Sequence, residues 1–170
     1  GVLTNISTIN GGVVSGQAVA FDLDPQQDLQ QSQIAVFGSL MKGSSYGDSR
    51  PKSRSALWNQ FNELIDDSLF YRDHKKEFTS GKTKSLPLTS RQYEAMLPVL
   101  SGQKPLVLHV ERAADIKNLI TLKKKLKKRQ VNLRLIINGA SEAWKVSPLL
   151  VENQIPVIMT PSLQTPMSFD

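Results

Sequence analysis

The chain has 170 residues, enough for one ordinary domain with a hydrophobic core, and we expect a single domain over 1–170. It contains no cysteine, which excludes disulfides and thiolate metal sites. No apolar run approaches the roughly 20 residues needed to cross a bilayer, so we expect a soluble protein without a membrane partner. The net charge is +6, and this excess of basic residues allows anionic partners to be considered.

Three strands are expected in the first part of the chain. Alternating and β-branched residues predict a strand over residues 2–9. Apolar runs predict two more, over Ala18–Leu23 and Ile34–Leu40. The glycine-rich residues 10–17 and the polar residues 24–33 between these runs are expected to be loops.

A helical region follows a polar loop over Lys42–Ser55. The helix is expected to fade near Phe78, before a second loop over residues 79–87. Ser90 is placed to cap a shorter helix that Pro98 bends or ends. The long helix is predicted from apolar residues spaced by three and four: Leu57, Phe61, Leu64, Ile65 and Leu69.

From residue 105 the pattern becomes a regular alternation of strands and helices. Such a βαβαβ run predicts parallel strands with right-handed crossovers, so the fold class is α/β. The nearly continuous apolar strands predict a sheet that is covered on both faces. The expected elements are strands over 105–110, 131–138 and 156–161 and helices over 112–129 and 141–153.

Polar residues follow the apolar part of each of these three strands. They are His109, Asn138 and Thr160, and Glu111 lies two residues after His109. Sites in parallel α/β folds form at the carboxyl ends of strands, so these four residues are the candidates for a functional pocket.

His109 has two interpretations. A neutral imidazole at a strand end is a ligand for a metal such as Zn²⁺, but a catalytic zinc needs about three protein ligands. The alternative is a polar residue that closes the strand and bonds to a neighbouring loop. His74, the other histidine, lies among Asp73, Lys75 and Glu77 and is expected to face solvent on the long helix.

The charge excess has a local origin in residues 123–129, "KKKLKKR", which contain six basic residues. Leu119, Leu122 and Leu126 recur at helical spacing through this region, so the run is expected to be the exposed face of an amphipathic helix. The alternative is a basic nucleic-acid-binding surface. No aromatic residue is interleaved for base stacking, which favours the first interpretation and a protein without a nucleic-acid partner.

The segments "KPLVLHVERAADI", "LRLIINGASEAWKV" and "IPVIMTPSLQTPMSFD" together resemble the amidohydrolase superfamily, most closely its imidazolonepropionase-like branch. The upstream "GVLTNISTINGGVVSGQAVAFDL", "YRDHKKEF" and "EAMLPVLSGQKPL" agree with the same family in order. The resemblance therefore covers nearly the whole chain, although no single motif is diagnostic.

The resemblance implies a (β/α)₈ TIM barrel that uses a divalent metal, such as zinc, to hydrolyse cyclic amides or other non-peptide C–N bonds of small molecules. Family members carry an HxH pair on strand one, single histidines on strands five and six, and an aspartate on strand eight. By position, His109 would be the strand-five ligand, and Asn138 stands near the place of the strand-six histidine.

The departures from the family pattern shape the expected function. The sequence has no HxH, and the chain ends at Asp170, shortly after the expected seventh strand. It therefore corresponds to the central part of a barrel, and we expect the isolated chain to bind no metal tightly and to be inactive. Asn138 in place of histidine keeps open a second reading, a catalytically degenerate segment that binds a ligand or partner.

Two further expectations follow from a partial barrel. Because its sheet edges are open, we expect the isolated chain either to self-associate or to leave segments disordered, above all residues 42–55 and 79–86. Relatives include exported proteins, so a periplasmic location of the longer protein is compatible with the resemblance.

Overall fold

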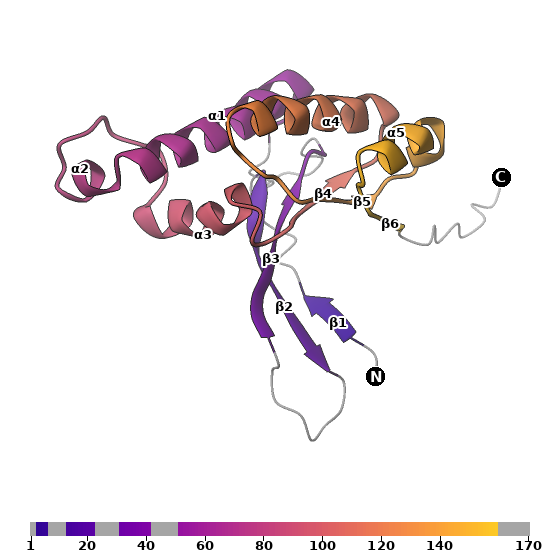
Figure 1. The fold of residues 1–170 in the computed structure, drawn as a ribbon, viewed down its shortest axis with the longest axis horizontal. Helices are drawn as coiled ribbons and strands as arrows, with labels where there is room; N and C mark the ends of the chain where they lie inside the picture. The colour runs from indigo at the N-terminus through magenta and orange to yellow at the C-terminus, as the bar shows by residue number, and fades with distance from the viewer. Residues whose placement is uncertain (1–2, 7–12, 23–30, 42–50, 160–170) are drawn as a thin grey trace, which may run out of the picture.

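The computed structural model describes residues 3–6, 13–22, 31–41 and 51–159. In chain order its elements are β1 (Leu3–Ile6), β2 (Val14–Asp22), β3 (Gln31–Ser39), α1 (Arg54–Asp73), α2 (Lys75–Thr79), α3 (Ser90–Leu100), β4 (Leu106–Val110), α4 (Ala113–Lys128), β5 (Leu135–Gly139), the 3-10 helix η1 (Ala143–Val146), α5 (Ser147–Glu152) and β6 (Val157–Met159) (Figure 1). Among these described helices, none combines the length and the apolar character that a membrane crossing requires.

All six strands form one sheet in the order in which they occur along the chain. β1, β2 and β3 pair antiparallel, whereas β3, β4, β5 and β6 pair parallel. The predicted α/β class and the parallel arrangement of β4, β5 and β6 are therefore confirmed. β3 is an additional parallel strand, and a helical segment of the chain links it to β4, as parallel pairing requires.

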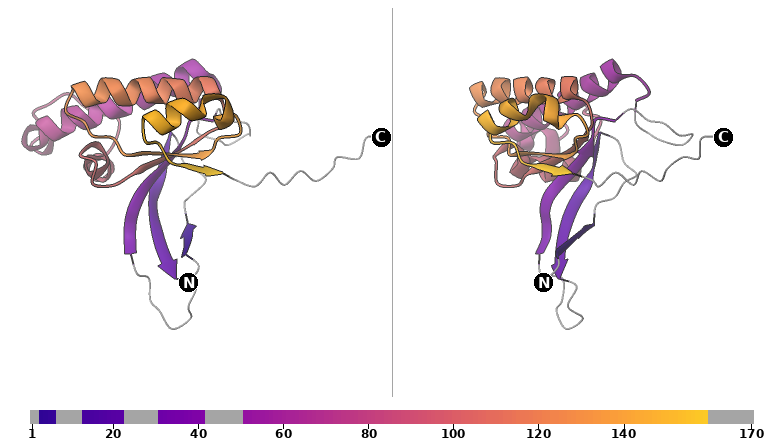
Figure 2. Two further views of the ribbon diagram at one scale, coloured as in Figure 1. Left: turned by 45° about the vertical axis from the view of Figure 1, so that its right-hand side comes forward. Right: turned by 90° about the vertical axis from the view of Figure 1, so that its right-hand side faces the viewer.

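The main core lies on one face of the sheet. Leu106, Leu108 and Ile137 point from the strands into it, and the helices gather on that side of β4, β5 and β6 (Figure 2). On the opposite face, Val107 and its neighbours form only a small cluster, and Ile158 is 47% exposed. The prediction of coverage on both faces is therefore wrong for the described residues, because the helices pack on one side.

α1 matches its predicted apolar face. Leu57, Phe61 and Ile65 are buried, and the Ser53 side chain accepts a hydrogen bond from Ala56 N at 3.2 Å at the start of the helix. The helical region ends at Thr79, close to the predicted end near Phe78, but His74 divides it into α1, which stops at Asp73, and the short α2.

The starts of β2 and α3 differ from prediction. β2 begins at Val14, so part of the glycine-rich segment is strand rather than loop. The N-cap of α3 is Thr89, not Ser90, and Thr89 N donates to Gln92 Oε1 at 3.0 Å. α3 continues past Pro98 to Leu100, the last residue of the run from which the helix was predicted.

The last part of the chain is also more divided than predicted. β5 starts at Leu135 rather than 131, and the expected helix over 141–153 is split into η1 and α5, with a proline in the first turn of α5. The expectation of disorder over 79–86 is wrong, since Gly81 N and Lys82 N donate to backbone carbonyls of α2. Residues 42–50 of the other segment lie outside the described residues.

The basic run on α4 is exposed, as predicted for Lys124, Lys125, Lys127, Lys128 and Arg129. Lys123 differs: it is half-buried and donates to the carbonyl of Asn153 at 3.1 Å. Leu119 and Leu126 are buried, so the amphipathic interpretation of this helix is confirmed.

Candidate active site at the carboxyl edge of the sheet

The parallel strands place three polar side chains side by side at their carboxyl ends. Ser39 on β3 pairs with His109 on β4, and His109 pairs with Asn138 on β5. Residues in register on neighbouring strands point to the same face of a sheet. These three therefore project from the face that carries no described helix, next to the edge where α/β folds build their sites.

His109 is held by a carboxylate from its own segment. Its Nε2 lies 2.7 Å from Oε1 of Glu111, just after β4 ends. The imidazole is 44% exposed and the carboxylate 28% exposed, so the pair is accessible from outside. Glu111 fixes the orientation of the ring, as a carboxylate partner commonly does for a functional histidine.

The second oxygen of Glu111 anchors the loop that follows β5. Ser141 N donates to Oε2 at 2.8 Å. Burial acts to raise the pKa of Glu111, but the hydrogen bonds from Ser141 and from His109 outweigh it, and the net effect is a lowered pKa. The carboxylate is therefore ionised at neutral pH and accepts hydrogen bonds on both oxygens.

Gly139 makes room for this pair at the end of β5. Its φ is +86°, and a Cβ there would lie 2.7 Å from both Nε2 and Cδ2 of His109 and against Oε1 of Glu111. A residue without a side chain is required at this position for both reasons, the backbone conformation and the close approach.

Glu142 ties the same loop to the start of α4. Its Oε2 accepts from Ala113 N at 2.9 Å, and its Oε1 accepts from Lys145 Nζ at 2.8 Å. The hydrogen bond from Lys145, together with that from Ala113, lowers the pKa of Glu142. Arg112, at the N-cap position of α4, makes no side-chain capping hydrogen bond. Glu142 instead places a carboxylate at the N-terminus of this helix.

Replacing Glu111 with glutamine is expected to make the fold about 1 kcal/mol less stable at pH 7, since a charged acceptor is lost from a partly buried site. The folded-state pKa of Glu111 lies below the unfolded value of about 4.3, so its stabilisation is present above that pH and is lost as the pH falls through the folded-state pKa. The difference between the two proteins should therefore shrink below about pH 4.

Urea unfolding of both proteins from pH 7 to pH 3 measures this difference. Glu77→Gln, the same change at an exposed position on α2, is the matched control and should lose less stability at pH 7 than Glu111→Gln. A Glu111→Gln deficit that stays constant with pH would show that the carboxylate charge contributes nothing.

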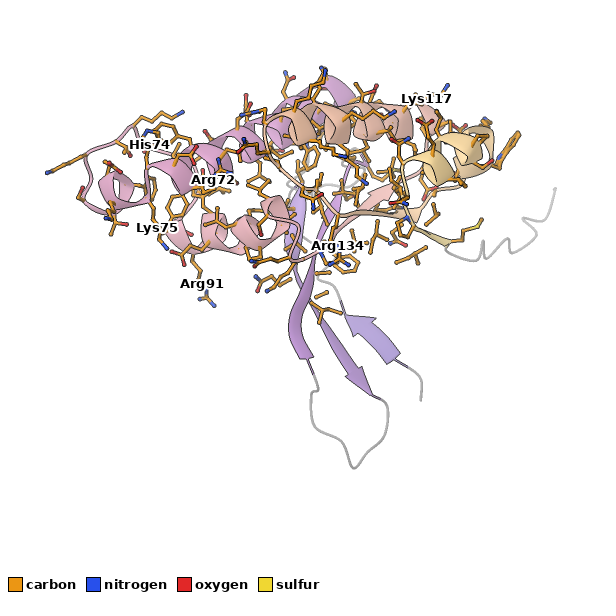
Figure 3. The ribbon with its side chains drawn as sticks, in the orientation of Figure 1. Arg72, His74, Lys75, Arg91, Lys117 and Arg134 are labelled. Carbon is orange, nitrogen blue, oxygen red and sulfur yellow. The ribbon has the colours of Figure 1, made fainter. Side chains whose placement is uncertain are left out.

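The structure brings together three of the four predicted site residues. His109 and Asn138 are in register, and Glu111 contacts His109. Thr160 lies outside the described residues. His74, labelled in Figure 3, is exposed at the end of α1, away from this edge, and stacks on Phe70, as expected for a surface histidine.

Ser39 and Ser141 belong to this edge and were missed from the sequence. Ser39 is buried, and its hydroxyl accepts from Met41 N at 3.2 Å. Residues 34–39 are an apolar run that ends in a polar residue, Ser39, as the three later strands do. This shared pattern is the sequence signal for a fourth parallel strand. Nothing in the sequence points to Ser141, whose contact depends on loop geometry.

The donor set for a metal at this edge is small. It holds one imidazole and one carboxylate, and Asn138 contributes an amide. Across the described residues, no group of three or more histidine, aspartate or glutamate side chains is placed to hold a metal ion. Because a catalytic zinc takes about three protein ligands, these residues do not form a zinc site by themselves.

Comparisons with known proteins support the fold. The sequence matches no protein-family model and no curated protein. Among solved structures, the chain is similar to an amidohydrolase from Thermotoga maritima, with a TM-score of 0.68 and 22% sequence identity over 93% of this chain. The match spans 42% of that amidohydrolase chain. At this identity the similarity establishes a shared fold.

Proposed function

We propose that this chain is the central part of an amidohydrolase-type (β/α)₈ barrel, of the imidazolonepropionase-like kind, and that the complete barrel hydrolyses a non-peptide C–N bond of a small cyclic amide. The observation that carries the proposal is the placement of Ser39, His109 and Asn138 in one register at the carboxyl ends of parallel strands. Enzymes with this barrel fold use that end of the strands for catalysis.

The helix-free face of the sheet supports the barrel assignment. In a (β/α)₈ barrel, alternate strand residues point to the helices and to the barrel interior. Here Leu106, Leu108 and Ile137 point to the helices, whereas Val107 and His109 point to the other face. That face would be the interior, with His109 at its carboxyl end.

In this proposal His109 occupies one ligand position, and Glu111 holds its ring. The remaining ligands come from parts of the barrel beyond the described residues. The metal is divalent by analogy with the barrel fold. Since the described donors do not make a complete site, we expect the chain alone to bind metal weakly and to have no hydrolase activity.

Asn138 favours a second candidate function. The amide of Asn138 is a poor zinc ligand compared with imidazole. Asn138 is in register with His109, at the position where a second histidine would give two neighbouring metal ligands. The second candidate is therefore a degenerate barrel whose pocket binds a ligand or a partner without hydrolysis.

Titration of the isotope-labelled chain with Co²⁺, followed by NMR, tests the role of His109. We expect weak binding, with a dissociation constant of about 1 mM, and line broadening centred on His109 and Gly139. His109→Ala should abolish this broadening, and His74→Ala should leave it unchanged.

Two results would contradict the proposal in different ways. Broadening confined to His74, or none, would remove His109 as a ligand position. Tight stoichiometric binding that depends on His109 would show that the chain carries a complete site, against the assignment as a partial one.

A further inference from the structure

Asn138 carries a polar side chain that the fold places at the candidate site and leaves unpaired. It is half-buried and lies in register between His109 on β4 and Ile158 on β6. No hydrogen bond joins its carboxamide to any group in the part of the chain that the structure describes. Its donor and acceptor are therefore available to a ligand that reaches the helix-free face of the sheet.

An apolar layer lies beside this polar row, one step back along the same face. Phe37, Val107 and Ile136 are in register on β3, β4 and β5, two residues before the polar side chain of each strand. They share the helix-free face, and Phe37 and Ile136 pack against the cluster that contains Val107. An apolar surface next to a few convergent polar groups is the usual composition of a small-molecule site.

A carboxamide presents a donor and an acceptor side by side. Its NH₂ group donates and its oxygen accepts. It therefore forms two parallel hydrogen bonds with a partner that offers an acceptor and a donor on one edge, as asparagine does with the edge of adenine. An imidazole has its two nitrogens pointing away from each other, so a histidine at residue 138 could not form this pair.

Ring closure decides which amides offer such an edge. An acyclic secondary amide is trans, so its N–H and its C=O point in opposite directions. A small lactam ring forces the amide to be cis, and the N–H and the C=O then lie on the same edge. The carboxamide of Asn138 can thus make two hydrogen bonds to a cyclic amide but only one to an acyclic amide.

We propose that Asn138 is a substrate-binding residue that determines specificity, and that its carboxamide pairs with the N–H and C=O edge of a cyclic amide. The inference rests on the proposed function for the class of substrate, but the pairing itself requires no metal. It assigns to Asn138 the selection of cyclic over acyclic amides, while His109 keeps its separate role as a ligand position.

Titration of the isotope-labelled chain in the absence of metal, followed by NMR, tests this pairing. Oxindole, a lactam fused to a benzene ring, is the probe. Acetanilide has the same heavy atoms but an open, trans amide, and N-methyloxindole keeps the ring but lacks the N–H. We expect oxindole to shift the side-chain NH₂ signals of Asn138 with a dissociation constant of about 1–10 mM. Each of the other two compounds should bind at least about fivefold more weakly, because one hydrogen bond is lost.

Three variants assign the preference to the carboxamide. Asn138→Leu keeps the approximate size of the side chain and should make oxindole bind as weakly as acetanilide. Asn138→Gln restores a carboxamide and should restore the preference for oxindole. Asn132→Leu, the same change at an exposed position before β5, should bind oxindole like the unmodified chain.

Absence of oxindole binding up to about 20 mM, equal binding of oxindole and acetanilide, or a preference that survives in Asn138→Leu would each overturn the proposal. These results are distinguishable from failure of the proposed function, which the Co²⁺ titration tests through His109. If Co²⁺ binds at His109 and oxindole does not bind, the proposed function stands and the role of Asn138 falls. If oxindole binds through Asn138 and Co²⁺ does not bind, the role of Asn138 stands in a pocket that holds no metal.

Discussion

Gly139→Ala is expected to lower the free energy of unfolding by about 2–4 kcal/mol and to move His109 away from Glu111. The backbone contributes the first part of this cost. At a φ of +86°, an alanine has to adopt a conformation that costs L-residues about 1–2 kcal/mol.

Steric overlap contributes the second part. The new methyl group would lie 2.7 Å from Nε2 of His109 and against the carboxylate of Glu111. Relieving such an overlap costs about 1–3 kcal/mol in packed sites. Here the side chains of His109 and Glu111 must move to relieve the overlap, because both lie over Gly139.

Gly81→Ala is a matched control for the backbone term. Gly81 also has a positive φ, +69°, but a Cβ there would meet nothing within 4 Å. Urea unfolding measures both losses, and the NMR signals of the His109 ring report its position. If both variants lose the same stability and His109 is unmoved, then the close approach at Gly139 has no energetic role.

The strands and helices after residue 105 could be predicted because their patterns are local. α4 shows this best, since Leu119, Leu122 and Leu126 recur at helical spacing, Leu119 and Leu126 are buried, and Leu122 packs against the core. The strand containing His109 was equally clear, because Leu106, Val107 and Leu108 form a short apolar run after a proline.

The contacts around His109 could not be predicted, because they depend on register and on loop conformation. The pairing of Ser39 with His109 requires β3 to lie parallel to β4, across more than sixty residues of intervening chain. The bond from Ser141 N to Glu111 depends on the turn after Gly139. A sequence pattern identifies the side chains at strand ends, but the loops decide which of them meet.

The same distinction explains the boundary errors. Thr89 rather than Ser90 caps α3 because the Gln92 side chain accepts a hydrogen bond from Thr89 N. The spacing of apolar residues, which predicts a helix, does not report on this bond. The helix-free face was missed because a continuous apolar strand is compatible with helices on both sides and with the interior of a closed barrel.

Asn138→His is expected to tighten the binding of Zn²⁺ or Co²⁺ by at least about tenfold, because the loss or gain of a group at a metal site typically changes affinity by that much or more. Residue 138 is in register with His109 on the adjacent strand, and such strands lie about 4.8 Å apart. Glu111 keeps its contact with the His109 ring, so the two imidazoles would raise the number of ligands at this edge from one to two, still fewer than the three that a catalytic zinc takes from protein.

Calorimetric titration of the chain with Zn²⁺ measures this gain, and two variants control it. Asn132→His adds an exposed histidine before β5, away from its carboxyl end, and should leave the affinity weak. Adding His109→Ala to Asn138→His should remove the gain, since both imidazoles are needed. An Asn138→His protein that binds no better than the original chain, or that keeps its affinity without His109, would show that these two register positions do not face a common metal site, and the amidohydrolase-type assignment of this edge would lose its chemical basis.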